Sequence, residues 1–249
     1  MPEWLQAGGW GLLAGSALLL GAAVGWFARV PQRVIASVMA FGAGVLLSAV
    51  SFELIAEAHE KGGLLPTTLG AAGGALAYTL ANVLLARWGA RHRKRSGDRQ
   101  PSESERPGSG SAIAVGALLD GVPESVVIGA SLLAGGPVSL VTVVAVFLSN
   151  VPEGLSSAAG MRRAGRSRRY VFALWSAIAL VSGVAAVAGF TLLGDAPPAA
   201  LAAITALAAG AILAMITDTM VPEAFEDAHL LVGLVTVAGF LTAFALSRP

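Results

Sequence analysis

Apolar residues recur along this chain in long runs that short polar connections separate. A run of roughly 20 apolar residues is long enough to cross a hydrocarbon core of ~30 Å as an α-helix. Eight such runs are predicted, at residues 8–28, 34–57, 63–87, 111–134, 137–161, 170–193, 199–222 and 230–246. The pattern therefore predicts an all-α integral membrane protein, with eight transmembrane helices in a single domain that covers residues 1–249.

The composition agrees with this prediction. With 55% hydrophobic and 12% charged residues, a soluble fold would have too little polar surface to cover its core. The 31 glycines suit helices that pack closely in lipid. Because cysteine is absent, disulfides and thiolate metal sites are excluded. The first run lacks a basic leading region and a cleavage site, so we expect no cleaved signal peptide.

Basic residues predict how the spans are oriented. All but Lys61 and Arg248 of the 16 Lys and Arg residues lie in or beside the connections after the first, third and fifth runs. The positive-inside rule places these connections in the cytoplasm and both termini outside, in a cell membrane. Residues 89–110 read as a basic, disordered cytoplasmic loop, with nucleic-acid or lipid-specific binding as the alternative. The expected partner is the lipid bilayer that the spans cross, and no nucleic acid is expected.

Two internal repeats suggest how the spans are grouped. "LDGVPES" (119–125) and "LSNVPEG" (148–154) match at a spacing of 29 residues. "ELIAEAHE" (53–60) and "TMVPEAFE" (219–226) match in spans predicted to run in opposite directions. Inverted halves are typical of transporters that bind substrate near the bilayer midplane. We therefore expect a 3+2+3 inverted-repeat arrangement of the eight spans.

The central pair of runs carries the candidate chemistry. Asp120 and Glu124 are four residues apart, as are Ser149 and Glu153, so each pair lies on one helix face near the bilayer centre. Each motif alone also fits a helix kink or a neutral, hydrogen-bonded acid. Together with the Asn150 amide they form an all-oxygen set that suits a divalent cation. We interpret Asp120, Glu124, Ser149, Asn150 and Glu153 as the metal site.

A second group of polar residues lies toward the ends of the second and seventh runs. Residues near a membrane interface are often only solvated, which is the alternative to a functional role. We hypothesise that this group forms the path for ion entry or exit: Glu53, Glu57, His59, Asp218, Glu223, Glu226 and His229.

At these motifs the chain resembles the ZIP (Zrt/Irt-like protein) family of divalent metal transporters, whose fourth and fifth spans carry H-N-x-P-E-G-type motifs. The corresponding stretches here are "DGVPES" (120–125) and "SNVPEG" (149–154). The second and seventh spans also resemble the family's patterns. The resemblance implies the 3+2+3 fold, a metal held between spans four and five, and an elevator-like movement.

The chain departs from the family at several ligand positions. Asp120 and Ser149 stand where the motifs have histidines, while Gly121 and Ala186 stand where a second metal site would have ligands. One metal site is therefore expected. Losing imidazoles weakens the preference for Zn²⁺ over harder ions. Zn²⁺ is the first expectation by resemblance, with Mn²⁺, Fe²⁺ and Cd²⁺ as further candidates, and the oligomeric state, including a homodimer, is left open.

An integral-membrane enzyme is the alternative class, because clustered acids also perform acid-base chemistry. A zinc amidase would need inward-facing histidines, but His59, His92 and His229 lie at or beyond span ends. A lipid phosphatase would need arginines within the membrane, whereas every Arg lies in a connection or at a span end. The sequence thus favours a non-enzymatic, secondary-type transporter or channel-like carrier for divalent metal ions.

Overall fold

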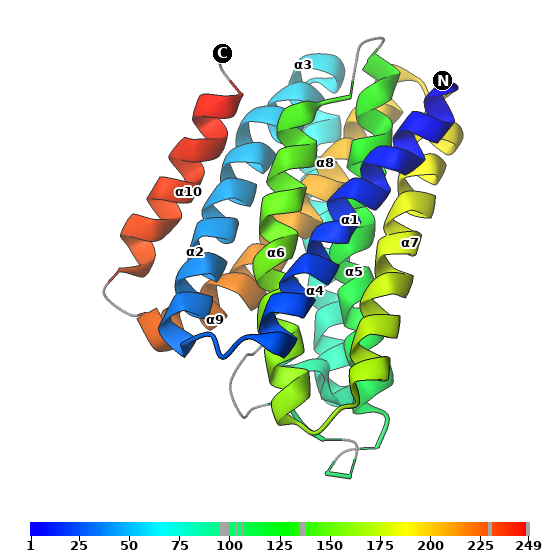
Figure 1. The fold of residues 1–249 in the computed structure, drawn as a ribbon. Helices are drawn as coiled ribbons and strands as arrows, with labels where there is room; N and C mark the ends of the chain where they lie inside the picture. The colour runs from blue at the N-terminus through cyan, green and yellow to red at the C-terminus, as the bar shows by residue number, and fades with distance from the viewer. Residues whose placement is uncertain (95–99, 103, 106, 135–137, 229–230, 248–249) are drawn as a thin grey trace.

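A computed structural model describes residues 1–94, 100–102, 104–105, 107–134, 138–228 and 231–247. These residues form a bundle of helices without any strand (Figure 1). The α-helices are α1 Glu3–Phe27, α2 Gln32–Ala49, α3 Ala56–Gly62, α4 Leu64–Leu85, α5 Ser109–Ser131, α6 Leu140–Arg163, α7 Arg168–Leu193, α8 Pro198–Met215, α9 Val221–Ala228 and α10 Val232–Leu246. The π-helical segments are η1 Val50–Ile55, η2 Ala86–Ala90 and η4 Ile216–Met220, and η3 Leu132–Ala134 is a 3₁₀ turn.

Seven helical segments are long and apolar enough to cross a membrane. They are Glu3–Phe27, Gln32–Gly62, Leu64–Ala90, Ser109–Ser131, Leu140–Arg163, Arg168–Leu193 and Pro198–Glu226. The last apolar run forms the shorter helix Val232–Leu246. Many large apolar side chains of α4 are exposed, Leu65 and Leu69 among them, as expected where a helix faces lipid. The chain is thus an all-helical, multi-pass membrane protein.

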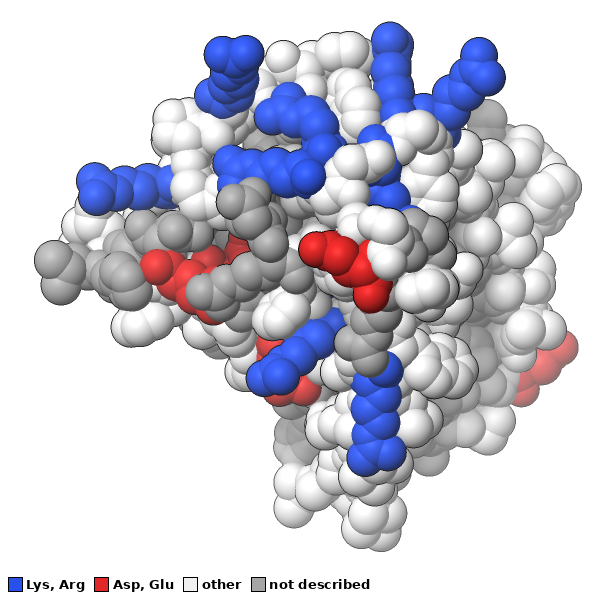
Figure 2. Space-filling view, turned by 90° about the horizontal axis from the view of Figure 1, so that it is seen from below, with Lys and Arg blue, Asp and Glu red and all other residues white. Residues whose placement is uncertain are grey.

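The two ends of the bundle differ in charge. Both termini lie at one end, and the connections after α1, η2 and α6 lie at the other (Figure 1). Figure 2 looks at that second end, where Lys and Arg side chains gather. We call it the basic end. The charge asymmetry read from the sequence is therefore also an asymmetry of the folded molecule.

The helices pack closely in a limited set of pairs. α1 packs on α6 and α7, α4 on α8, α2 on α10 and α6, and α5 on α7 and α8. Glycines allow the backbones to touch: a Cβ at Gly74 would overlap the backbone of Leu207, and one at Gly154 would overlap Leu18. Gly154 directly follows Glu153, so the close contact between α1 and α6 lies next to this candidate ligand and holds that part of α6 in place.

The π-helical segments η1 and η4 interrupt the second and seventh spans at matching places. Glu57 and Glu223 are equivalent in the repeated motif, and η1 begins seven residues before Glu57 just as η4 begins seven before Glu223. Each segment widens one turn and shifts the side chains that follow it. The repeat seen in the sequence therefore has a counterpart in backbone geometry.

Candidate cation site

The two Pro-Glu motifs lie midway along α5 and α6, and each helix continues through its proline. The side chains of Asp120, Glu124 and Glu153 point into the bundle, and their residues are 2%, 1% and 5% exposed. We call these three the carboxylate cluster. Burying three acids away from water is unfavourable unless cations or hydrogen bonds compensate their charge.

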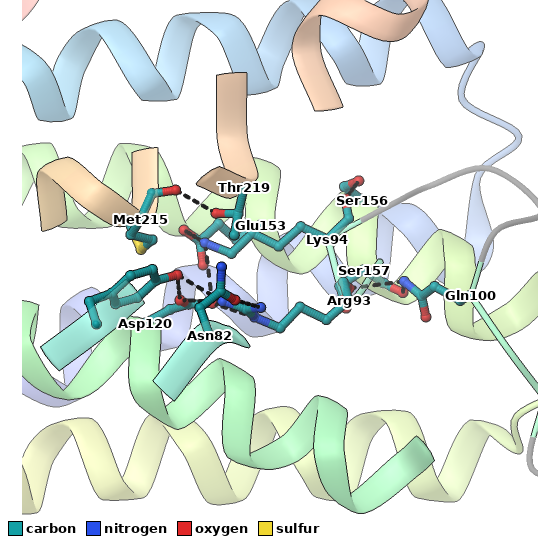
Figure 3. A network of polar contacts seen from close by, with 11 residues as sticks. Asn82, Arg93, Lys94, Gln100, Asp120, Glu153, Ser156, Ser157, Met215 and Thr219 are labelled. Carbon is teal, nitrogen blue, oxygen red and sulfur yellow. Dashed lines mark hydrogen bonds and ion pairs between the residues drawn. The ribbon is translucent and has the colours of Figure 1, made fainter. Parts of the chain in front are cut away.

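Two cationic side chains provide that compensation, and they come from the connection after η2. Arg93 and Lys94 extend from the basic end to the carboxylate cluster (Figure 3). Lys94 Nζ lies 2.6 Å from Glu153 Oε1 and 3.4 Å from Asp120 Oδ2. A single ammonium group therefore bridges a carboxylate of α5 and a carboxylate of α6, the helices between which a metal was predicted.

Arg93 holds Asp120 with the fork geometry that guanidinium and carboxylate groups share. Its Nε and Nη2 donate to Asp120 Oδ2 and Oδ1, both at 3.0 Å. The Tyr78 hydroxyl donates to Asp120 Oδ1 at 2.7 Å, and Arg93 Nη1 donates to Asn82 Oδ1 at 2.7 Å. Burial opposes the charge on Arg93, but Asp120 outweighs this effect, and the pKa of Arg93 is raised above its ordinary value. The guanidinium group stays charged.

The backbone of this segment is also held. Ser157 Oγ donates to the carbonyl oxygen of Arg93 at 2.7 Å, and Ser156 Oγ donates to the carbonyl oxygen of Lys94. Gln100 Nε2 donates to the same Arg93 carbonyl at 2.9 Å. We call residues 91–94 the docked segment. Two serines one turn beyond Glu153 on α6 thus form its seat.

Two glycines make room for the docked segment. Gly89 has φ 109°, a conformation that side chains with a Cβ rarely adopt, and it redirects the chain at the end of η2. Gly116 of α5 faces the stem of Arg93, and a Cβ there would lie 2.8 Å from Arg93 Nε and closer still to Cδ. The segment therefore fits a slot in the helix surface.

Glu124 differs from the other two acids. Its Oε1 is buried and has no hydrogen-bond partner among the described residues. With Arg93 facing Asp120 and Lys94 facing Glu153, the cluster retains one acid that no cation contacts directly within the described chain.

The remaining predicted ligands, Ser149 and Asn150, form hydrogen bonds to main-chain carbonyls outside the carboxylate cluster. Ser149 Oγ donates to the Val146 carbonyl at 2.9 Å, and Asn150 Nδ2 donates to the Ala14 carbonyl of α1 at 2.9 Å. Neither hydrogen bond reaches the carboxylate cluster. On α7, Ser182 rather than Ala186 faces Gly121, because Ala186 packs against glycines of α1 and α5.

The predicted path residues of the second span lie toward the terminal end of the bundle. Glu57 is half-buried, forms an ion pair with Lys61 and lines a small cavity with Ser131 and Thr142 of α5 and α6. Glu53 is half-buried in η1, while His59 is exposed. Glu53 and Glu57 are therefore partly shielded from solvent, and His59 is not.

The path residues of the seventh span are divided. Glu223 is buried, and its Oε1 lies 2.9 Å from Ser156 Oγ, which joins it to the seat of the docked segment. Asp218 is exposed and Glu226 is half-buried. His229 lies outside the described residues. In this group, Glu223 is joined to the site's hydrogen-bond network through Ser156.

The docked segment differs from the expected disordered loop at 89–110. Arg93, Lys94 and Gln100 are 3%, 5% and 4% exposed. A basic run near a membrane is usually solvated, and nothing local distinguishes Arg93 from its basic neighbours. One sequence feature could have indicated a buried polar partner: in the third span, Tyr78 and Asn82 place two polar groups one helical turn apart on one face. Both bind Arg93.

Within the described chain, no group of three or more His, Asp or Glu side chains converges as a metal site would. Lys94 and Arg93 occupy the space between the carboxylates, so coordination by Asp120, Glu124 and Glu153 stays a prediction. Models of known protein families do not match this chain, and neither do curated proteins.

Proposed function

We propose that this protein is a secondary-type transporter or channel-like carrier that moves divalent metal ions across the cell membrane, and that it is not an enzyme. The observation that carries the proposal is the carboxylate cluster between α5 and α6, in the middle of an apolar bundle. Three acids are held there, and two of them, Asp120 and Glu153, form ion pairs with the buried side chains of Arg93 and Lys94. A buried site with that preference is suited to a cation substrate.

The packing of the helices supports a 3+2+3 inverted repeat. Exchanging the first three spans with the last three, and the fourth with the fifth, maps the observed pairs onto one another. The α1–α6 pair becomes α7–α5, the α4–α8 pair becomes α10–α2, and the α2–α6 pair becomes α8–α5. The matched positions of η1 and η4 agree. Such symmetry allows one site to face either side of a membrane through an elevator-like shift.

We also propose how the protein is oriented in the membrane and which ion it carries. The basic end faces the cytoplasm and both termini lie outside, because Lys and Arg gather at that end (Figure 2). Membership in the ZIP family is supported by the Pro-Glu motifs that carry the site. Zn²⁺ is the expected ion by that resemblance, and the all-carboxylate ligand set admits Mn²⁺, Fe²⁺ and Cd²⁺.

The enzyme alternative is weaker at this site. Exposed His59 lies near the opposite end of the bundle from the docked segment, and no other histidine was predicted within a span. The Arg93 side chain does lie buried inside the bundle, which a phosphate-binding enzyme would require. However, its Nε and Nη2 are directed at Asp120 and its Nη1 at Asn82, so the group is committed to protein partners.

The test is metal uptake into proteoliposomes that contain the purified protein without nucleotide. We expect Zn²⁺ uptake that Mn²⁺, Fe²⁺ and Cd²⁺ inhibit to different degrees. Glu124→Ala and Glu153→Ala should each lower uptake at least about tenfold, which corresponds to roughly 1.4 kcal/mol. Glu60→Ala, at an exposed acid of the same charge, is the matched control. Uptake that requires ATP, or that survives in either cluster variant, would contradict the proposal.

A further inference from the structure

We propose that the docked segment is a tethered cation plug, in which Arg93 and Lys94 take the place of the metal ion and close the site from the basic end. This inference rests on the proposed function, because it assigns regulation to the same carboxylate cluster. A metal ion and the docked segment cannot bind the cluster together, since both need the oxygens of Asp120 and Glu153. Metal binding and release of the segment are therefore coupled.

The contacts are those of a built site and not of an incidental surface ion pair. Exposed ion pairs contribute little, and a buried pair is tolerated when further hydrogen bonds satisfy its charges. Arg93 donates such hydrogen bonds to Tyr78 and Asn82 of α4, and both cations are nine-tenths buried or more. Three helices, α4, α5 and α6, thus contribute side chains to one docking position.

The backbone contacts show that the segment itself is recognised. Ser156 and Ser157 are uncharged, and their hydroxyls donate to the main-chain carbonyls of Lys94 and Arg93 rather than to the cationic side chains. Ser156 also contacts Glu223 at 2.9 Å, which ties the seat to the seventh span. A shift of α5 and α6 relative to the seventh span during transport would break the Ser156–Glu223 contact, and it would move Ser156 away from the Lys94 carbonyl at the same time. The plug is therefore linked to the same movement as the metal.

Gly116 provides a way to displace the plug without changing a charged residue. Its missing Cβ is the space that the Arg93 stem fills, so Gly116→Ala should push Arg93 away from Asp120. Gly9 of α1 has no atom within 4 Å of its ideal Cβ, and Gly9→Ala serves as the matched control. Arg93→Gln/Lys94→Gln removes the cations themselves and leaves the acids unchanged.

The first experiment measures whether the segment is docked. Because the chain has no cysteine, Gln100→Cys gives a single thiol that is buried when the segment is docked. Maleimide labelling from the basic end should be slow in this background, and about tenfold faster when Gly116→Ala or Arg93→Gln/Lys94→Gln is added. Gly9→Ala should leave the rate unchanged. Ser104→Cys, at an exposed position, reports general access of the reagent.

The second experiment measures competition with metal. Mn²⁺, which binds thiolates weakly, should accelerate labelling of Gln100→Cys and leave Ser104→Cys unchanged. In the cysteine-free protein, calorimetry with Zn²⁺ and Mn²⁺ should show affinities several-fold tighter in Gly116→Ala and in Arg93→Gln/Lys94→Gln than in the wild type, because no plug must be displaced.

The outcomes separate this inference from the proposed function. Because Gln100→Cys itself removes the hydrogen bond from Gln100 to the Arg93 carbonyl, labelling rates are compared within this background. A rate that neither Gly116→Ala nor Arg93→Gln/Lys94→Gln increases would overturn the plug. If Gly116→Ala and Arg93→Gln/Lys94→Gln both accelerate labelling but leave the metal affinity unchanged, the segment does not compete with metal. That result would overturn the competition and would not contradict the proposed transport function. If no variant binds Zn²⁺ or Mn²⁺ at all, the proposed metal function itself fails, and the competition fails with it.

Discussion

The Tyr78 hydroxyl donates a hydrogen bond to Asp120 Oδ1 at 2.7 Å and accepts one from Arg93 Nη2 at 2.8 Å. This phenol therefore joins the anion of α5 to the cation of the docked segment, from a third helix, α4. Both its donor and its acceptor capacity are used. Because the arrangement is buried, loss of the hydroxyl leaves two charged groups with one partner fewer.

Tyr78→Phe is therefore expected to destabilise the protein by about 1–3 kcal/mol, since buried charged groups lose a hydrogen bond. The measurement is thermal unfolding in detergent. Tyr170→Phe is the control, because Tyr170 donates a hydrogen bond of the same length, 2.7 Å, to an uncharged group, the carbonyl of Gly110. Equal losses of stability in the two variants would show that the hydrogen bonds of Tyr78 to charged groups contribute no more than a hydrogen bond to a neutral carbonyl.

The acids of the carboxylate cluster should respond differently to neutralisation in metal-free protein. Glu153→Gln leaves Lys94 without its 2.6 Å partner, and breaking a buried pair costs up to about 3–5 kcal/mol. Glu124→Gln removes an acid whose Oε1 has no hydrogen-bond partner among the described residues, so stability should be unchanged or higher. Unfolding of both variants without added metal tests this order. A reversed order would contradict the pairing of Lys94 with Glu153.

Metal binding should weaken as the pH falls from about 7 to 5, because the carboxylates that bind a cation must be unprotonated and binding releases any protons they hold. Acid therefore favours the protonated, metal-free form, and the metal affinity falls with the pH. Calorimetric titrations in buffers of different ionisation enthalpy would measure both the affinity and the protons released. An affinity that is flat across this range would show that protons do not compete, and that the tethered cations alone balance the empty cluster.

The number of bound metals should be one per chain. Gly121 offers no side-chain ligand, and the nearest group across from it on α7 is the neutral hydroxyl of Ser182. A second ion beside the first would therefore lack a carboxylate of its own. The stoichiometry from calorimetry, or a metal-bound structure, decides this. Two central ions of similar affinity would refute the single-site prediction.

The close contact between α4 and α8 gives a test with neighbouring glycines. A Cβ at Gly74 would overlap the backbone of Leu207, whereas the ideal Cβ of Gly73 has no atom within 4 Å. Gly74→Ala should cost about 1–3 kcal/mol through overpacking, and Gly73→Ala should be neutral or stabilise by about 0.5–1 kcal/mol as a better helix former. Thermal unfolding of the two variants side by side measures the difference. Similar stabilities would contradict the packing.

By itself, the sequence determined the features that depend on local pattern. Runs of apolar residues long enough to cross a membrane predicted the helical spans, because a backbone in lipid must satisfy its hydrogen bonds internally. Repeated motifs marked α5 and α6 and predicted that Asp120, Glu124 and Glu153 are the residues of interest. All three are buried at mid-helix in the structure.

The tertiary structure decided which groups compensate these acids. Arg93 and Lys94 lie 27 and 59 residues from the acids they bind, Asp120 and Glu153, in a basic stretch whose members look alike in sequence. What selects them is the direction in which Gly89 sends the chain, the slot at Gly116 and the serine seat on α6. None of these has a local signature, because each depends on where separate helices meet. The physical reason is that ion pairing is selected by three-dimensional proximity and burial, whereas membrane insertion is selected by local composition.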